Sequence, residues 1–163
     1  MIKNSRKKNI VLSPIVKWVG GKRQLLEDII PLIPKTFTTY VEPFVGGGAV
    51  LFDIQPKKAI INDFNHEIIN IYKIIRDNPN DLISALQEHE RLNSEEYFYK
   101  IRALDRTEQY DEISDVEKAA RIIYLNKTCY NGLFRVNQAG QFNSPYGKYK
   151  NPNIVNMPVV LAM

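Results

Sequence analysis

Three consecutive glycines and a downstream aspartate are the residues of this chain whose types and spacing most directly suggest chemistry. The glycines at positions 46–48 follow a short apolar segment that ends at Glu42. Asp63 ends the next apolar segment, seventeen residues after Gly46. Glycines allow a backbone to approach a ligand closely, and a carboxylate at the end of the next parallel strand can accept hydrogen bonds from ribose hydroxyls. The spacing therefore predicts a nucleotide-like ligand at the carboxyl edge of a parallel sheet; a packing turn with Asp63 as a helix N-cap is the alternative.

The glycine loop does not fit two common nucleotide-binding patterns. The dinucleotide pattern G-x-G-x-x-G requires a glycine where Leu51 stands. The Walker A loop fails at the glycine pair before Lys22, because position 16 is Val16 and position 23 is Arg23. We therefore do not expect a P-loop NTPase.

An aromatic side chain among cations forms a second candidate site. Trp18 follows Lys17 and is separated by one valine and two glycines from Lys22 and Arg23. A core position is a poor explanation for a tryptophan with so many cationic neighbours, although it remains the alternative. The composition favours an aromatic face and an ammonium group that close over a ligand bearing a carboxylate.

A third segment, residues 130–150, combines aromatic, basic and amide side chains with turn-forming residues. Four Tyr or Phe residues follow Tyr130 and are interleaved with arginine and lysine. Arginine can pair with guanine, asparagine with adenine, and an apolar side chain can contact the thymine methyl group. An aromatic side chain can enter the base stack where a base has been extruded. The segment is therefore predicted to contact DNA, with tight turns at 131–132 and at 140; a solvated loop is the alternative.

The charge of the chain is unevenly distributed, although its formal net value is only +4. Residues 1–26 contain seven Lys or Arg and no acid, and residues 126–163 contain four and no acid. Residues 27–125 contain eleven Lys or Arg against eighteen Asp or Glu. Two basic ends around an acidic middle predict that both ends line a polyanion-binding surface. A basic arm followed by an ordinary tail is the alternative.

The composition indicates one soluble globular domain and argues against several classes. No apolar run approaches the ~20 residues needed to cross a bilayer, and the basic N-terminus does not read as a signal peptide. Cys129 is the single cysteine, which rules out an internal disulfide and fits a reducing cytoplasm. Two histidines and one cysteine present no metal-ligand cluster. We therefore expect a cytoplasmic protein without a membrane segment or a bound metal.

Hydrophobic periodicity predicts the elements that position these residues. They are an extended segment at 15–18, an apolar helical face at 25–30, buried strands at 39–42 and 59–62, and helices at 49–53, 65–76, 81–91, 94–104 and from 114 onward. Ser114 and Glu117 fit a capping box at the start of the last helix. Strand, glycine turn, helix, strand and helix begin a doubly wound α/β fold.

Taken together, the three segments resemble DNA adenine-N6 methyltransferases of the Dam type, the D12 class. The similarity extends from about residue 15 to residue 152. It rests on motifs in the family's order: KWVGGK at 17–22, EPFVGGG at 42–48 with ND at 62–63, YNGLFR at 130–135 and NSPYGKYK at 143–150. The resemblance implies the α/β, Rossmann-like fold of S-adenosylmethionine-dependent methyltransferases, of which this chain carries the N-terminal part with an inserted helical region. The implied parts are a flexible basic arm (1–13), a cofactor-binding part (14–78), a helical target-recognition region with a DNA-contacting hairpin (79–155) and an atypical tail (156–163).

The resemblance also implies a cofactor site for S-adenosylmethionine, from which such enzymes transfer a methyl group to the exocyclic nitrogen of adenine. Trp18 and Lys22 would contact the cofactor, the glycine loop would pass beneath its amino-acid portion, and Asp63 would hold its ribose. The cofactor-binding residues implied in this way are Trp18, Gly21, Lys22, Glu42, Phe44, Gly46, Gly48 and Asp63.

Double-stranded DNA is the implied partner, recognised at a short palindrome that is commonly GATC. Lys17 resembles a lysine that approaches the first guanine, and Arg135 would read guanine. Tyr130 and Asn131 would occupy or stabilise the gap left by the flipped adenine. The remaining contacts implied are those of Leu133 and Pro145 with the thymine methyl group and those of Tyr149 and Lys150 with the DNA backbone.

The chain departs from the family pattern at the catalytic motif. The family uses Asp-Pro-Pro-Tyr or Asn-Pro-Pro-Tyr to hold the adenine amino group, and no such sequence occurs here; the nearest, at 151–154, lacks the second proline and the aromatic residue. No catalytic residue is therefore predicted in this chain. We expect a truncated or frameshifted gene product, no methylation of a GATC duplex by the 163 residues alone, and marginal stability, because two strands would leave an edge and an apolar face around Val41 exposed.

Two rival functions stay open at this stage. The first is a non-catalytic DNA-binding remnant, or half of a split methyltransferase that complements a polypeptide carrying the missing strands. The second is a nucleotide-binding protein unrelated to DNA, which the basic ends and the hairpin disfavour. A cognate restriction endonuclease and a complementing C-terminal fragment are the further partners that the resemblance suggests.

Overall fold

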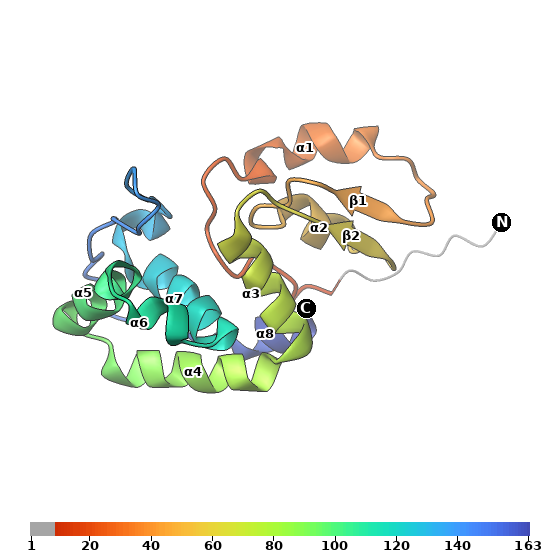
Figure 1. The fold of residues 1–163 in the computed structure, drawn as a ribbon. Helices are drawn as coiled ribbons and strands as arrows, with labels where there is room; N and C mark the ends of the chain where they lie inside the picture. The colour runs from red at the N-terminus through yellow and green to blue at the C-terminus, as the bar shows by residue number, and fades with distance from the viewer. Residues whose placement is uncertain (1–8) are drawn as a thin grey trace.

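The computed structural model describes residues 9–163, which form a mixed α/β structure with a small parallel sheet. Figure 1 shows the sheet with α1 and α2 at one end of the molecule and helices α4 to α7 at the other, with α3 leading from one to the other. The helices are α1 (Leu26–Ile29), α2 (Ala49–Ile54), α3 (His66–Asp77), α4 (Pro79–Leu92), α5 (Glu95–Ala103), α6 (Gln109–Glu112), α7 (Asp115–Thr128) and α8 (Met157–Ala162), and the strands are β1 (Tyr40–Glu42) and β2 (Ala59–Ile61). Most of the predicted basic arm, residues 1–8, lies outside the described residues.

Strands β1 and β2 are parallel, joined by the glycine loop and α2, as the pattern predicts. The prediction that both strands are buried is wrong. Val41 and Ile60 lie opposite each other in the register, and each side chain is 56 % exposed. A parallel sheet is buried only when both of its faces are covered, and in the described residues this sheet has two strands. The exposed face around Val41 is the feature that the resemblance led us to expect.

The segment after Gly20 and Gly21 forms three short turns instead of one packed helix. A 3-10 turn (Lys22–Leu25), α1 and a second 3-10 turn (Ile30–Leu32) follow one another, and none of their residues is buried. The apolar spacing at 25–30 therefore does not mark a core-facing helix. The expected extended segment at 15–18 is not a strand either, although Ile15 and Val16 are buried in the core.

Helix α3 connects the sheet to the helical part because its apolar side chains recur on one face. Ile68, Ile71 and Ile75 are buried against α7 and α4. Asn65 caps the helix, since its side-chain oxygen accepts hydrogen bonds from the backbone N–H groups of the first turn.

Helix α7 is the central helix of the molecule and packs against α3, α4 and α5. The capping box predicted at Ser114 and Glu117 is confirmed at its start. Every residue from 119 to 126 is buried, including Arg121 and Asn126. Buried polar side chains require hydrogen-bond partners, so these two residues decide how neighbouring segments attach to the helix.

The last described segment forms α8, with Val159 and Val160 buried and packed near α4. None of the helices in residues 9–163 has the length and the apolar composition that a membrane crossing requires.

Candidate cofactor and nucleic-acid site

Asp63 and the glycine loop meet at the carboxyl ends of β1 and β2. The Oδ2 atom of Asp63 accepts a hydrogen bond from the Gly46 N–H at 2.8 Å, and Oδ1 accepts one from the Asn65 N–H at 3.0 Å. The alternative in which Asp63 caps the helix is therefore wrong, because Asn65 is the cap. A carboxylate has about four lone-pair sites, so Asp63 retains acceptor capacity for further donors.

The conformation of the glycine loop depends on its lack of side chains. Gly48 has a φ of 77°, and a Cβ atom there would lie 2.6 Å from Phe52 Cε2 and 2.7 Å from the Tyr72 hydroxyl. The same hydroxyl donates a hydrogen bond to the Gly46 carbonyl at 2.9 Å. Burial raises the pKa of Tyr72, and the carboxylates of Glu42 and Asp63 raise it further, so the hydroxyl keeps its proton. Close packing against Phe52 and Tyr72 therefore explains why position 48 is a glycine. Gly46 differs, because its N–H donates a hydrogen bond to Asp63.

Lys22 connects the first motif to the glycine loop. Its Nζ atom lies 3.1 Å from Glu42 Oε1 and also donates to the Phe44 carbonyl. Glu42 is only 6 % exposed, and its other oxygen accepts a hydrogen bond from the Tyr40 hydroxyl at 2.8 Å. A buried carboxylate requires a cation or hydrogen-bond donors, and Glu42 has the Lys22 ammonium group and the Tyr40 hydroxyl. The Lys22 ammonium group thus lies beside the glycine loop, where its partners are Glu42 and the Phe44 carbonyl.

Trp18 lies between the glycine loop and the predicted DNA-contacting segment, residues 130–150. Its ring stacks on Phe134, with centroids 4.5 Å apart and an interplanar angle of 25°. A Cβ atom on Gly46 would lie 3.1 Å from Trp18 Cδ1, so the indole and the loop are in close contact. The partly buried side chain therefore packs within the protein and also borders the glycine loop.

Asn126 is a positioning residue that the sequence analysis missed. Its Oδ1 accepts a hydrogen bond from the Lys17 N–H at 2.9 Å, and its Nδ2 donates to the carbonyls of Lys17 at 2.9 Å and Gly132 at 3.0 Å. One buried amide thus joins the KWVGGK segment to the start of the YNGLFR segment. The signal available in the sequence was an asparagine within the long buried run of α7.

The segment from Tyr130 onward is a hairpin with both predicted turns. Asn131 and Gly132 have φ angles of 56° and 64° within a 3-10 turn, and Gly140 has a φ of 77° at the tip. Antiparallel bridges pair Cys129 with Tyr146 and Val136 with Phe142. Additional hydrogen bonds close the tip, where the Asn137 side chain accepts from the N–H groups of Ala139 and Gln141.

The predicted base-contacting side chains lie on the exposed part of this hairpin. Arg135 is exposed, and its Nε donates to Asn143 Oδ1 at 2.8 Å. Tyr130 and Leu133 are also exposed. The Tyr130 N–H donates to the Pro145 carbonyl at 2.9 Å, which brings Tyr130 and Pro145 together. Other predicted site residues at the surface are Phe44, Asn131, Tyr149 and Lys150. Gly21 lies in a turn in which its N–H donates to the Trp18 carbonyl.

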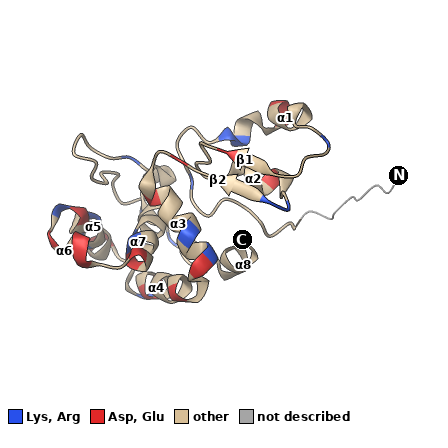
Figure 2. Ribbon diagram, turned by 45° about the vertical axis from the view of Figure 1, so that its right-hand side comes forward, with Lys and Arg blue, Asp and Glu red and all other residues tan. Residues whose placement is uncertain are grey.

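The two basic parts of the sequence meet at Lys17 and Lys127. Burial lowers the pKa of Lys127, and the ammonium group of Lys17 lowers it further. Within residues 9–163 neither lysine forms an ion pair. Figure 2 shows acidic residues on α4, α5 and α6, in the helical part of the molecule, and also on α1 and α3. The sequence analysis did not single out Lys127, and a nearby anion would relieve the repulsion between the two cations.

Metal and thiol chemistry find no support in the described part of the chain. It contains no group of three or more metal-ligating side chains. Cys129 is fully buried, and burial raises the pKa of its thiol to about 11, so the reactive thiolate is scarce near neutral pH.

Comparison with known proteins agrees with this geometry. Residues 18–160 match the sequence model of the family described as D12 class N6 adenine-specific DNA methyltransferase. The chain belongs to this family. The predicted family is therefore confirmed, and it is a family of DNA adenine methyltransferases.

Similar proteins include both modification enzymes and adenine methylases. The Type II methyltransferase M1.LlaDCHI of Lactococcus lactis subsp. cremoris is 50 % identical over 155 residues, which cover 95 % of this chain and 55 % of that protein. The Type II methyltransferase M.MjaIII of Methanocaldococcus jannaschii is 43 % identical, covering 88 % of this chain and 55 % of its own length. The DNA adenine methylase of Escherichia coli strain K12 is 36 % identical, covering 84 % and 48 %. The chain thus spans about half the length of these relatives.

Proposed function

We propose that this chain forms the cofactor-binding and DNA-recognition parts of an adenine-N6 DNA methyltransferase with a Rossmann-like fold. The observation that carries the proposal is the contact between Asp63 and the Gly46 N–H at the carboxyl ends of two parallel strands. Ligands of open α/β sheets bind at this edge. Asn126 joins Lys17 to Gly132 at the start of the hairpin. The neighbour of Lys17, Trp18, contacts the glycine loop, so the proposed DNA hairpin is tied to the same edge.

The residues at this edge fit S-adenosylmethionine. Asp63 retains lone pairs that suit ribose hydroxyls, and two exposed aromatic side chains, Phe44 and Phe64, lie in sequence next to the glycine loop and to Asp63. Lys22 and Trp18 also border the loop. When bound, the cofactor supplies an electrophilic methyl group.

The hairpin suits the recognition of duplex DNA at a short palindrome such as GATC. Arg135 would pair with guanine, and Lys17 would approach the first guanine of the site. Tyr130 and Asn131 would fill the gap left by the flipped adenine. Leu133 and Pro145 would contact the thymine methyl group, and Tyr149 and Lys150 the phosphate backbone. Because methyl transfer requires the adenine amine to lie in line with the methyl group, these contacts contribute to the reaction by positioning the base.

The cofactor site is tested by Asp63→Asn in the 163-residue chain. Trp18 is the only tryptophan and borders the loop, so its fluorescence reports S-adenosylmethionine binding directly. Loss of hydrogen bonds to a charged group costs about 1.5–3 kcal/mol, so the dissociation constant is expected to rise roughly ten- to a hundredfold.

The matched control is Asp77→Asn, which removes the same charge from an exposed residue at the end of α3. Its affinity for the cofactor should equal that of the native chain. Equal affinities of the Asp63 and Asp77 variants would contradict the proposed cofactor site.

The exposed sheet favours a second candidate, in which this chain complements a polypeptide that carries the remaining strands. Beside β2 lies a cavity of about 680 Å³ whose lining includes Phe52, Ile61 and Ile75. Co-expression with a fragment that contains Asp-Pro-Pro-Tyr, followed by digestion of the host DNA with a methylation-sensitive nuclease, tests this candidate. Protection only in the presence of both polypeptides would support it. We also propose a cytoplasmic location. A cognate restriction endonuclease is a further proposed partner, because two relatives are named Type II methyltransferases.

A further inference from the structure

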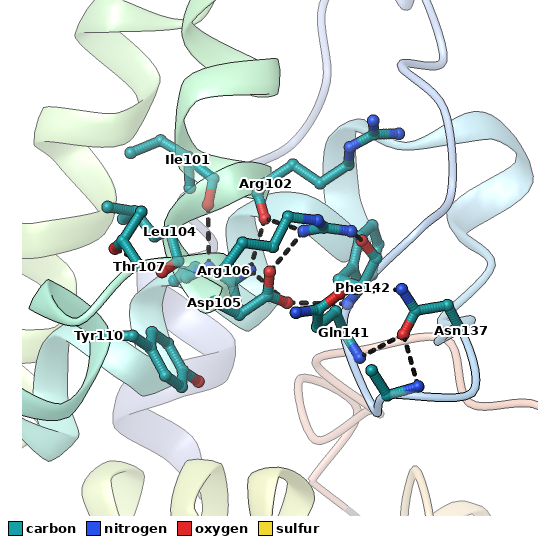
Figure 3. Close-up of polar contacts among 12 residues, drawn as sticks. Ile101, Arg102, Leu104, Asp105, Arg106, Thr107, Tyr110, Asn137, Gln141 and Phe142 are labelled. Atoms are coloured by element: carbon teal, nitrogen blue, oxygen red, sulfur yellow. Dashed lines mark hydrogen bonds and ion pairs between the residues drawn. The ribbon is translucent and has the colours of Figure 1, made fainter.

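A partly buried ionic cluster lies beneath the DNA hairpin, where α5 ends and the following 3-10 turn (Leu104–Arg106) begins. Arg121 of α7 is 2 % exposed, and its Nη2 lies 2.8 Å from Asp105 Oδ2. The same guanidinium donates to the carbonyls of Ile101 and Arg102, both at 2.9 Å. Arg106 adds a second ion pair to Asp105. Figure 3 shows Asp105, Arg106 and Phe142 together in this cluster.

The cluster binds both backbone groups of one hairpin residue. Asp105 Oδ2 accepts a hydrogen bond from the Phe142 N–H at 2.7 Å, and Arg106 Nη2 donates to the Phe142 carbonyl at 2.7 Å. Two residues further along, Arg102 Nη1 donates to the Ser144 carbonyl at 3.2 Å. Two hairpin residues, Phe142 and Ser144, are therefore bound by side chains of residues 102–106, which satisfy backbone groups that a neighbouring strand would otherwise satisfy.

Phe142 in turn sets the position of Arg135. Phe142 forms the antiparallel bridge with Val136, and the adjacent Asn143 N–H donates to the Arg135 carbonyl at 2.9 Å. The Asn143 side chain then accepts from Arg135 Nε at 2.8 Å. A shift of Phe142 along the hairpin would move Asn143 and change the direction of the Arg135 guanidinium, because each side chain alternates sides along a strand.

We propose that Asp105 and Arg106 are positioning residues that determine sequence specificity by fixing the direction of Arg135. The inference rests on the proposed function, because it assigns Arg135 to base recognition. The Asp105–Arg106 ion pair is partly exposed, and a partly exposed ion pair contributes little net stability. Stability alone is therefore a weak explanation for two charged side chains that bind one hairpin residue.

The test compares Arg106→Gln with Arg91→Gln in the full 163-residue chain. Both changes remove one positive charge; Arg91 lies exposed on α4, paired with Glu88. Each protein is incubated with a pool of duplexes whose central segment is randomised, and the bound fraction is sequenced. The native chain and Arg91→Gln should enrich the same site. In Arg106→Gln, the preference for guanine at one position should fall about tenfold, which is the discrimination that a bidentate arginine provides. Arg106→Lys should recover part of this preference.

Two outcomes separate the failure of this inference from failure of the proposed function. If the native chain enriches no sequence, the proposed function fails, and the inference fails with it. If the native chain enriches a site and Arg106→Gln enriches it equally, only the inference is overturned.

Hydrogen exchange provides a measurement independent of DNA. In Asp105→Asn, the amide of Phe142 should exchange faster than in the native chain, while amides in the middle of α3 remain protected, which shows that the variant is folded. Unchanged protection at Phe142 in a folded variant would overturn the inference. Arg106→Gln serves as the second variant if Asp105→Asn does not fold.

Discussion

Single side chains outside the glycine loop determine its shape. Asp63 binds the Gly46 N–H, Tyr72 binds the Gly46 carbonyl, and Lys22 binds the Phe44 carbonyl. Hydrogen bonds to charged groups contribute about 1.5–3 kcal/mol each, more than bonds between neutral groups. The loop is therefore expected to keep one conformation with or without a ligand, which lowers the entropic cost of binding.

At the same scale, we expect Lys127 to lower the stability of the folded chain and to raise its affinity for DNA. Lys127→Met should leave the melting temperature unchanged or raise it, because a partly buried cation beside Lys17 is removed. It should weaken binding to duplexes of any sequence and lower the slope of log affinity against log salt by about one. Thermal unfolding and titrations over a range of salt concentrations measure both effects.

The control for this prediction is Lys100→Met, which removes an exposed lysine from α5. Its salt dependence should equal that of the native chain. An unchanged slope for Lys127→Met would show that this lysine does not contact phosphate.

At the scale of elements, α4, α5 and α7 meet around an aromatic cluster that contains His89. The imidazole stacks on Tyr124 at 4.8 Å, and its Nδ1 lies 2.8 Å from the Tyr97 hydroxyl. The pKa of His89 falls from its ordinary 6.5 to about 4, mainly because the imidazole is buried; the carboxylate of Glu88 opposes the shift, and Arg121 adds to it.

This interface should weaken in mild acid. The unfolded chain binds a proton at His89 near pH 6.5, whereas the folded chain does so only near pH 4, so the free energy of unfolding falls as the pH falls through this window. The loss should reach about 2 kcal/mol by pH 5, since each unit of pKa shift corresponds to about 1.4 kcal/mol. Urea unfolding at pH 7 and pH 5 measures it.

His89→Gln should show a smaller loss between these two pH values, because glutamine does not titrate. The other histidine provides the control: His66→Gln changes an exposed residue at the start of α3 and should retain the native pH dependence. The prediction is contradicted if both variants lose the same free energy as the native chain.

At the scale of the whole molecule, the helical part is well packed and the sheet is not. The buried residues from α3, α4, α5 and α7 form one apolar core. Val41 and Ile60 instead form an apolar pair on an open sheet face, each more than half exposed. Exposed apolar faces beside unpaired strand edges promote association.

We therefore expect the isolated chain to self-associate through this face. The double variant Val41→Thr, Ile60→Thr should elute as a monomer at concentrations where the native chain is larger, as measured by light scattering after size exclusion. Leu32→Thr, which removes an exposed leucine outside the sheet, is the control and should behave like the native chain. A monodisperse native monomer with a cooperative thermal melt would contradict this prediction.

Much of the local structure was predictable from the sequence. The two parallel strands, the intervening helix, the capping box at Ser114 and the turns at 131–132 and 140 are all confirmed. Each depends on backbone preferences or hydrogen bonds within a few residues. The burial of the strands was predicted wrongly, because burial depends on what covers a sheet and not on the strand's own composition.

The sequence by itself determined the family, through three motifs and their order, and the positions of the turns and caps that shape them. Only the tertiary structure decided that Asn126 joins Lys17 to the hairpin across 109 residues of sequence and that Trp18 lies between the glycine loop and Phe134. It also decided that Asp105 and two arginines bind the backbone of the hairpin. Local patterns report the conformational preferences of neighbouring residues. Contacts between distant side chains depend on how whole elements pack, which no single segment encodes.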